Sequence, residues 1–120
     1  MDKKKEAIGL LRQFDALRRA GENLKALGEI SPSEELEERL AKTEKTLGII
    51  QRGLAALTPE QRLILSRFYI YREKGNPQRL CEALGVEQSS VYRRKDQALA
   101  KFIEAIWGDG FLTSVITGSE

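Results

Sequence analysis

Apolar residues in the first half of the chain recur at alternating spacings of three and four, the pattern of helices packed along a seam. The pattern covers residues 2–27 and then residues 32–57. Between the two runs, Gly28 is suited to close the first helix, and residues 31–34 have the serine, proline and glutamate of a capping box. Because the connection is short, we predict an antiparallel helical hairpin over residues 1–57.

The spacing defines two seams and leaves some apolar residues over. The first seam consists of Ala7, Leu10, Phe14, Leu17, Gly21 and Leu24, and the second of Leu36, Leu40, Thr43, Leu47, Ile50, Leu54 and Leu57. Three further apolar residues, Ile8, Leu11 and Ile49, lie off both seams. They are expected to face either a second subunit or the C-terminal half of the chain.

The pattern changes after Leu57. Thr58, Pro59 and Gln61 form a second capping box, which starts a helix expected to continue through Tyr71. A turn, a short helix over 77–84 and a longer helix ending near Trp107 follow. We therefore predict an all-α fold, in which the hairpin precedes a helix-turn-helix domain of three to four helices over residues 58–107. The tail, residues 108–120, has no clear period.

The last two helices fit the spacing of a helix-turn-helix motif. If Pro77 is the first of twenty positions, the small residue at the helix crossing is Cys81 and the turn glycine is Gly85. The apolar positions of the window are filled by Leu80, Leu84, Val86 and Val91. Arg94 departs from the pattern, since its position is usually apolar, but an arginine stem can lie along apolar surface. An ordinary helical hairpin remains an alternative.

The second helix of such a motif enters the DNA major groove, so its polar side supplies the candidate site. The side chains expected to read bases are Glu87, Gln88, Ser89, Tyr92, Arg93 and Asp96. The side chains expected to contact phosphates are Arg79, Ser90, Arg94, Lys95 and Lys101. An amide can bind adenine and a guanidinium can bind guanine in a bidentate manner, which are the roles we predict for Gln88 and Arg93.

Net charge is only +2, but its distribution favours this assignment. Residues 58–107 carry nine basic and six acidic side chains, whereas residues 1–57 carry eleven basic and ten acidic ones. One copy with so modest an excess would bind DNA weakly at physiological salt. We therefore expect double-stranded DNA to be bound by a homodimer formed through the N-terminal helices. A monomeric buttress and a long parallel coiled coil remain alternatives for the hairpin.

Composition argues against catalysis and against a membrane protein. The chain has no histidine, and its single cysteine, Cys81, has no base beside it. We expect no enzyme activity, no cofactor and no metal. No apolar run approaches the roughly 20 residues that span a bilayer, and the basic start lacks the apolar core of a secretory signal. The expected location is cytoplasmic.

The C-terminal half resembles a known family. Residues 57–69 resemble the first helix of the C-terminal promoter-reading domain of bacterial sigma factors, and residues 80–102 resemble its helix-turn-helix. The similarity is closest to small phage-encoded regulators of the ArpU and RinA kind, which carry a sigma-like helix-turn-helix behind a helical N-terminal region. This resemblance, which covers about half of the chain, implies a transcriptional regulator of phage or prophage late genes. RNA polymerase is then a candidate further partner.

Two other functions use similar elements. A small-terminase-like DNA-packaging subunit also combines a helix-turn-helix with helices that oligomerise, but it forms rings. A protein-binding adaptor on RNA polymerase would use the same helices without salt-sensitive binding to DNA.

Overall fold

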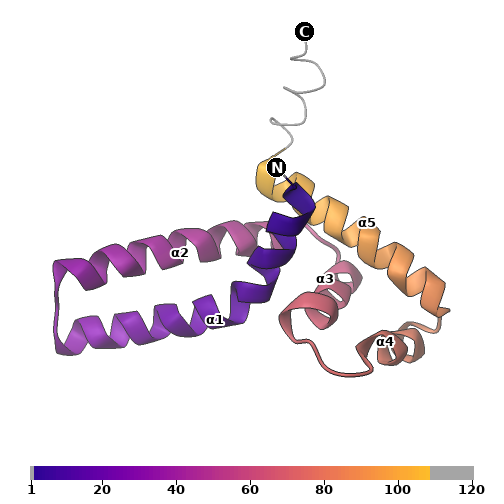
Figure 1. Ribbon diagram of the computed structural model, residues 1–120, viewed down its shortest axis with the longest axis horizontal. Coiled ribbons are helices and arrows are strands. Elements are labelled where there is room, and N and C mark those ends of the chain that lie inside the picture. The colour runs from indigo at the N-terminus through magenta and orange to yellow at the C-terminus, as the bar shows by residue number, and fades with distance from the viewer. Residues whose placement is uncertain (1, 109–120) are drawn as a thin grey trace, which may run out of the picture.

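The computed structural model describes residues 2–108, and within this range the chain folds into helices with no strand (Figure 1). The elements are α1 (Lys3–Ile30), α2 (Glu34–Ala55), α3 (Pro59–Leu65), the π-helix η1 (Ser66–Ile70), α4 (Asn76–Leu84) and α5 (Gln88–Trp107). The predicted all-α class is confirmed. From Asp109 on, the predicted tail lies outside the described residues.

The first two helices pack as the antiparallel pair that their spacing predicts, and they extend away from the other helices (Figure 1). We call their projecting part, residues 18–46, the arm. Gly21 is buried in the seam of the arm, where a Cβ atom would lie 3.6 Å from both Leu47 Cδ1 and Thr43 Cγ2. A Cβ atom would thus fit in ordinary van der Waals contact, so the packing of the two helices does not require glycine at this position.

The predicted boundary between these helices is wrong by three residues at the end of α1 and by two residues at the start of α2. Gly28 lies inside α1, which continues to Ile30 and is capped by Ser31, whose N–H donates to the Leu27 carbonyl at 2.8 Å. The N-cap of α2 is Ser33, whose hydroxyl accepts from the Leu36 N–H at 3.1 Å. Ser33 has the extended backbone of an N-cap residue, and the acidic residues of the first turn follow directly after it.

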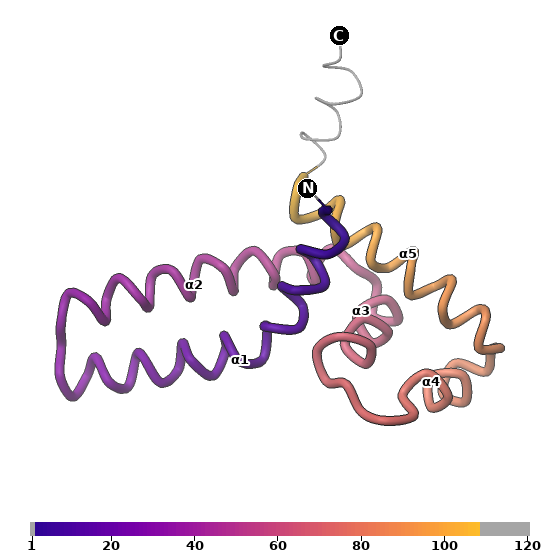
Figure 2. Tube along the Cα trace, in the orientation of Figure 1, coloured from indigo at the N-terminus to yellow at the C-terminus, as the bar shows by residue number. Residues whose placement is uncertain are grey.

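The first turns of α1 bend away from the arm and run toward α5 (Figure 2). Both halves of the chain therefore contribute to one main core. Its buried residues are Ala7, Leu11, Ile50, Leu57, Leu65, Tyr69, Ala98, Leu99 and Phe102. Leu11 is fully buried there, and Ile8 packs against it from the rim of the core. The structure therefore packs Leu11 and Ile8 against the C-terminal half, whereas the half-buried Ile49 does not belong to this core.

A close crossing of α2 and α5 closes this core. Gly53 is buried on α2, and a Cβ atom there would lie 2.6 Å from both Phe102 Cε1 and Ile106 Cγ2. Real Cβ atoms do not approach so closely, because the repulsion at this distance is steep. The crossing therefore requires glycine at this position.

The helix that begins at Thr58 has the predicted capping box. The Gln61 N–H donates to Thr58 Oγ1 at 3.1 Å, and the Thr58 N–H donates to Gln61 Oε1 at 3.0 Å. The helix does not continue regularly to Tyr71, however. It widens at Ser66 into η1, where the Tyr71 N–H donates to the Ser66 carbonyl at 2.7 Å. In this wider turn Tyr69 is buried in the main core while Phe68 faces α5.

Candidate nucleic-acid interface

The connection between α4 and α5 has the geometry that its sequence predicts. Gly85 ends α4 in the left-handed conformation, with φ 68° and ψ 34°, which favours a residue without a Cβ atom. The N–H groups of Gly85 and Val86 donate to the Cys81 carbonyl at 2.9 and 3.1 Å. Glu87 then has extended backbone and precedes α5, although its side chain makes no capping hydrogen bond. The chain thus turns sharply between two helices.

A small second core holds this turn in place. Its buried residues are Ile64, Leu80 and Val91, one from each of α3, α4 and α5. Five partly buried side chains pack around them, namely Leu63, Phe68, Cys81, Leu84 and Val86. Every apolar position of the predicted window therefore contributes to one cluster. The orientation of α5 relative to α4 follows from this packing.

The opposite side of α5 is exposed to solvent. Val91, Ala98, Leu99 and Phe102 are buried on its inner side. All six side chains predicted to read bases are exposed, from Glu87 at the start of the helix to Asp96 in its middle. The Arg93 guanidinium donates to Ser90 Oγ at 3.4 Å and makes no ion pair with any described residue. The geometry therefore leaves the first three turns of α5 accessible to a ligand.

Three of the predicted phosphate contacts make ion pairs within the molecule. Arg94 Nη1 lies 2.7 Å from Glu60 Oε1, so this departure from the sequence pattern joins α5 to α3. Arg79 Nη1 lies 2.9 Å from Glu73 Oε2. Lys95 pairs with Asp96 Oδ1 at 2.9 Å. Lys101 is exposed and has no ion pair with a described residue, while Ser90 is half-buried.

Lys95 does not point outward as its position predicts. Its side chain is only 17% exposed, and its Nζ lies 5.6 Å from the ring centroids of both Phe68 and Tyr92. Burial lowers the pKa of the Lys95 ammonium, but the hydrogen bond to Asp96 and the nearby Tyr69 phenol outweigh it, so the net pKa is raised. Tyr92 packs edge-on against Phe68 at 5.5 Å. This aromatic setting fixes the middle of α5.

The start of α4 is tied to η1 through Asn76. Asn76 is 2% exposed, and its Nδ2 donates to the carbonyls of Arg67 at 2.8 Å and Tyr71 at 3.1 Å. These bonds satisfy two carbonyls at the end of η1 and hold the first turn of α4 in place. The sequence indicates a helix start from the asparagine–proline pair, but it gives no sign of this buried amide.

Sequence reasoning missed a group of arginines beside that amide. Arg12, Arg67 and Arg72 line a hollow of about 250 Å³ together with Phe68, Tyr69, Glu73, Asn76 and Pro77. None of the three arginines makes an ion pair within residues 2–108, and Glu73 is already paired with Arg79. The hollow lies at the N-terminus of α4, where backbone N–H groups favour anions. No periodic pattern reveals it, because the arginines come from α1, η1 and the turn after η1.

Comparison of the chain with protein-family models, with curated proteins and with solved structures gave no match. In the part of the chain that the structure describes, no helix is both long enough and apolar enough to span a membrane.

Proposed function

We propose that this chain is a dimeric, sequence-specific DNA-binding transcriptional regulator with a sigma-like helix-turn-helix, acting on phage or prophage genes. One observation supports this most strongly. The left-handed turn at Gly85 and the small core behind it orient α5 so that its polar N-terminal half stands free. A major groove about 12 Å wide admits such a helix.

Base recognition then falls to the exposed first turns of α5. Gln88 and Arg93 are the proposed readers of adenine and guanine, because each can form two parallel hydrogen bonds to its base. Tyr92 is partly held by Phe68, so it presents one edge at a fixed position. A helix N-terminus carries a partial positive charge, which favours a phosphate near Ser89 and Ser90.

Phosphate contacts come from side chains without strong internal partners. Lys101 is one, and the arginines at the hollow beside α4 (Arg12, Arg67 and Arg72) are additional candidates. Arg79 and Arg94 can also serve, because an exposed ion pair contributes only about 0–1 kcal/mol and is readily exchanged for a phosphate. Lys95 acts mainly by positioning α5, since its ammonium lies against aromatic rings.

The test begins with selection of binding sequences from random DNA by the full chain. Fluorescence anisotropy then measures the affinity of Arg93→Ala for the selected site and for single-base variants of it. We expect a loss of about 1–3 kcal/mol, with discrimination lost at one base position, because Arg93 reads that base. Arg52→Ala is the matched control, since it removes the same charge from the exposed surface of α2.

Three outcomes would contradict the proposal. No enriched sequence, or binding that does not weaken with salt, would favour the protein-binding adaptor. Equal losses for Arg93→Ala and Arg52→Ala would show a general effect of charge. A ring of eight or more copies in solution would favour the packaging subunit over the dimeric regulator.

A further inference from the structure

One side of the arm combines exposed apolar residues with a hollow. On α1, Ala20, Asn23, Leu27 and Ile30 are spaced by three, four and three residues, so they share a side of the helix. On α2, Glu35, Glu38, Arg39 and Lys42 stand at positions i, i+3, i+4 and i+7, which also share a side of the helix. We call these eight residues the arm face. A hollow of about 470 Å³ lies in it, lined by Ala20, Asn23, Leu24, Arg39, Lys42 and Thr43.

Two large apolar side chains of the arm face stand exposed between this hollow and the end of α1. Ile30 is 81% exposed and Leu27 is 49% exposed, although both belong to the helix that contributes Leu11 to the main core. A pair of helices can bury only the residues along their shared seam, so side chains beside the seam need a further partner. Nothing among the described residues covers them.

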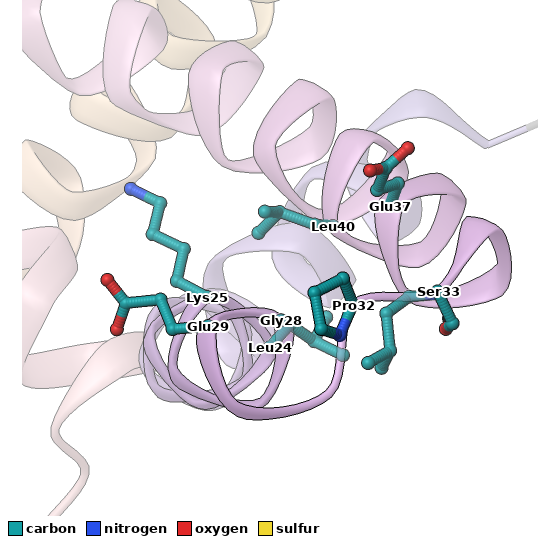
Figure 3. A pocket seen from close by; sticks show the side chains of 9 residues that line it. Leu24, Lys25, Gly28, Glu29, Pro32, Ser33, Glu37 and Leu40 are labelled. Carbon is teal, nitrogen blue, oxygen red and sulfur yellow. Dashed lines mark hydrogen bonds between the residues drawn. The ribbon is translucent and has the colours of Figure 1, made fainter.

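The opposite side of the arm is different in character. It holds a smaller hollow of about 320 Å³, where Leu24, Pro32 and Leu40 lie between the helices and the charged ends of Lys25, Glu29 and Glu37 point away (Figure 3). Beside it, Lys25 Nζ pairs with Glu44 Oε2 at 3.3 Å and joins α1 to α2. This side is already bridged within one chain, so the arm face is the better candidate for a partner.

Charge along the arm is divided into two blocks. The tip, residues 26–38, has five acidic and no basic side chains, whereas residues 18–25 and 39–46 together have six basic and two acidic ones. On the arm face, none of Glu35, Glu38, Arg39 and Lys42 makes an ion pair within the described chain. A parallel pair of arms would place like charges together. An antiparallel pair would place each acidic tip beside a basic stretch.

We propose that the arm face binds a second copy of this chain in antiparallel orientation, with a two-fold axis near residues 38 and 39. In this register Glu35 and Glu38 of one copy lie against Lys42 and Arg39 of the other. Ile30 of each copy then reaches the hollow of its partner, beside Asn23 and Leu24. The proposal specifies the dimer on which the proposed function rests, but its test requires no DNA.

The first measurement is sedimentation equilibrium of the full chain at low and at high salt. We expect a dimer whose dissociation constant rises at least tenfold between 50 mM and 500 mM salt. Salt screens the attraction between the acidic tip of one copy and the basic stretches, residues 18–25 and 39–46, of the other. A chain that stays monomeric at all concentrations would overturn the proposal. So would tighter association at high salt, which is the behaviour of like charges brought together.

The second measurement uses Ile30→Asp, which places a charge in the proposed contact without removing a core residue. We expect at least a hundredfold rise in the dissociation constant of the dimer and an unchanged helical content by circular dichroism. Ser33→Asp is the matched control, because it adds the same charge to the exposed tip, keeps an N-cap acceptor for α2 and lies at the hollow on the opposite side of the arm. Equal effects of the two variants would contradict the proposal.

Orientation is tested by disulfide formation in a Cys81→Ser background. Two chains, one with Glu35→Cys and one with Lys42→Cys, are oxidised separately and as a mixture. The proposed register brings these positions together only in the mixture, since like positions stay about 10 Å apart along the helix axis at 1.5 Å per residue. Cross-linking of Glu35→Cys with itself, in preference to the mixed pair, would indicate a parallel dimer and overturn the proposal.

Discussion

The two halves of α1 place similar residues in opposite environments. Near its start, Leu11 is fully buried among residues of α2, η1 and α5, whereas near its end Ile30 is 81% exposed. The spacing of apolar residues is alike in both halves. The difference lies in the number of helices that surround α1. Several helices pack against its first turns, whereas only α2 packs against it along the arm. Periodicity therefore identifies the apolar side of a helix but not what covers it.

The sharpest test of this comparison is one substitution made at both ends of the helix. Leu11→Ala should lower the free energy of unfolding by about 2–5 kcal/mol, because it leaves a cavity in a fully packed core. Leu24→Ala should cost about 1 kcal/mol, since the partly exposed side chain of Leu24 loses less buried area. Chemical denaturation, at concentrations where the chain is monomeric, measures both values. Equal losses of unfolding free energy would show that the arm is packed as fully as the first turns of α1.

The two buried glycines of the hairpin offer a second contrast. Gly53→Ala should cost about 1–3 kcal/mol, because its Cβ atom would overlap Phe102 and Ile106 and force α2 away from α5. Gly21→Ala should instead stabilise the protein by about 0.5–1 kcal/mol, since its Cβ atom fits at 3.6 Å and alanine favours the helix. Thermal unfolding of both variants gives the sign directly. If Gly21→Ala destabilised the protein, the two helices of the arm would have to be packed too closely at Gly21 to admit a Cβ atom.

The smallest expected effect concerns Asp15, which lies between the two halves of α1. Arg18 hydrogen-bonds to it at 2.8 Å and lowers its pKa below the ordinary 3.8, partly against the effect of burial, and Arg19 adds to the shift. A lowered folded-state pKa stabilises the protein above pH 3.8, and this contribution is lost as pH falls through the folded value. Asp15→Asn should therefore be slightly less stable than the native chain at pH 7 and equally stable near pH 2. A difference that persists at low pH would exclude this ion pair as its source.

Sequence reasoning succeeds where a local rule determines the structure. The capping box at Thr58 and the left-handed turn at Gly85 depend on a few neighbouring residues, and both are present as predicted. It fails where rules compete or where distant segments meet. Ser31 and Ser33 are both plausible caps, and only the continuation of α1 past Gly28 decides between them.

In the candidate site, too, some features follow from local sequence rules and others do not. The exposed side of α5 follows from helical period, since residues opposite Val91 and Leu99 must face outward. Lys95 is at the edge of that side, and the aromatic rings of Phe68 and Tyr92 turn it inward. The hollow between Arg12, Arg67 and Arg72 depends on the docking of α1 against η1, which no local pattern encodes.

The main core has a mechanical consequence. Because Leu11 and Ile50 lie in the same packed cluster as Phe102, both long helices pack directly against the part of the molecule that carries α5. The length of the two helices therefore sets the distance between the tip of the arm and α5. Adding seven residues to each long helix would move it outward by about 10 Å, so anything held at the tip would shift by the same step relative to α5.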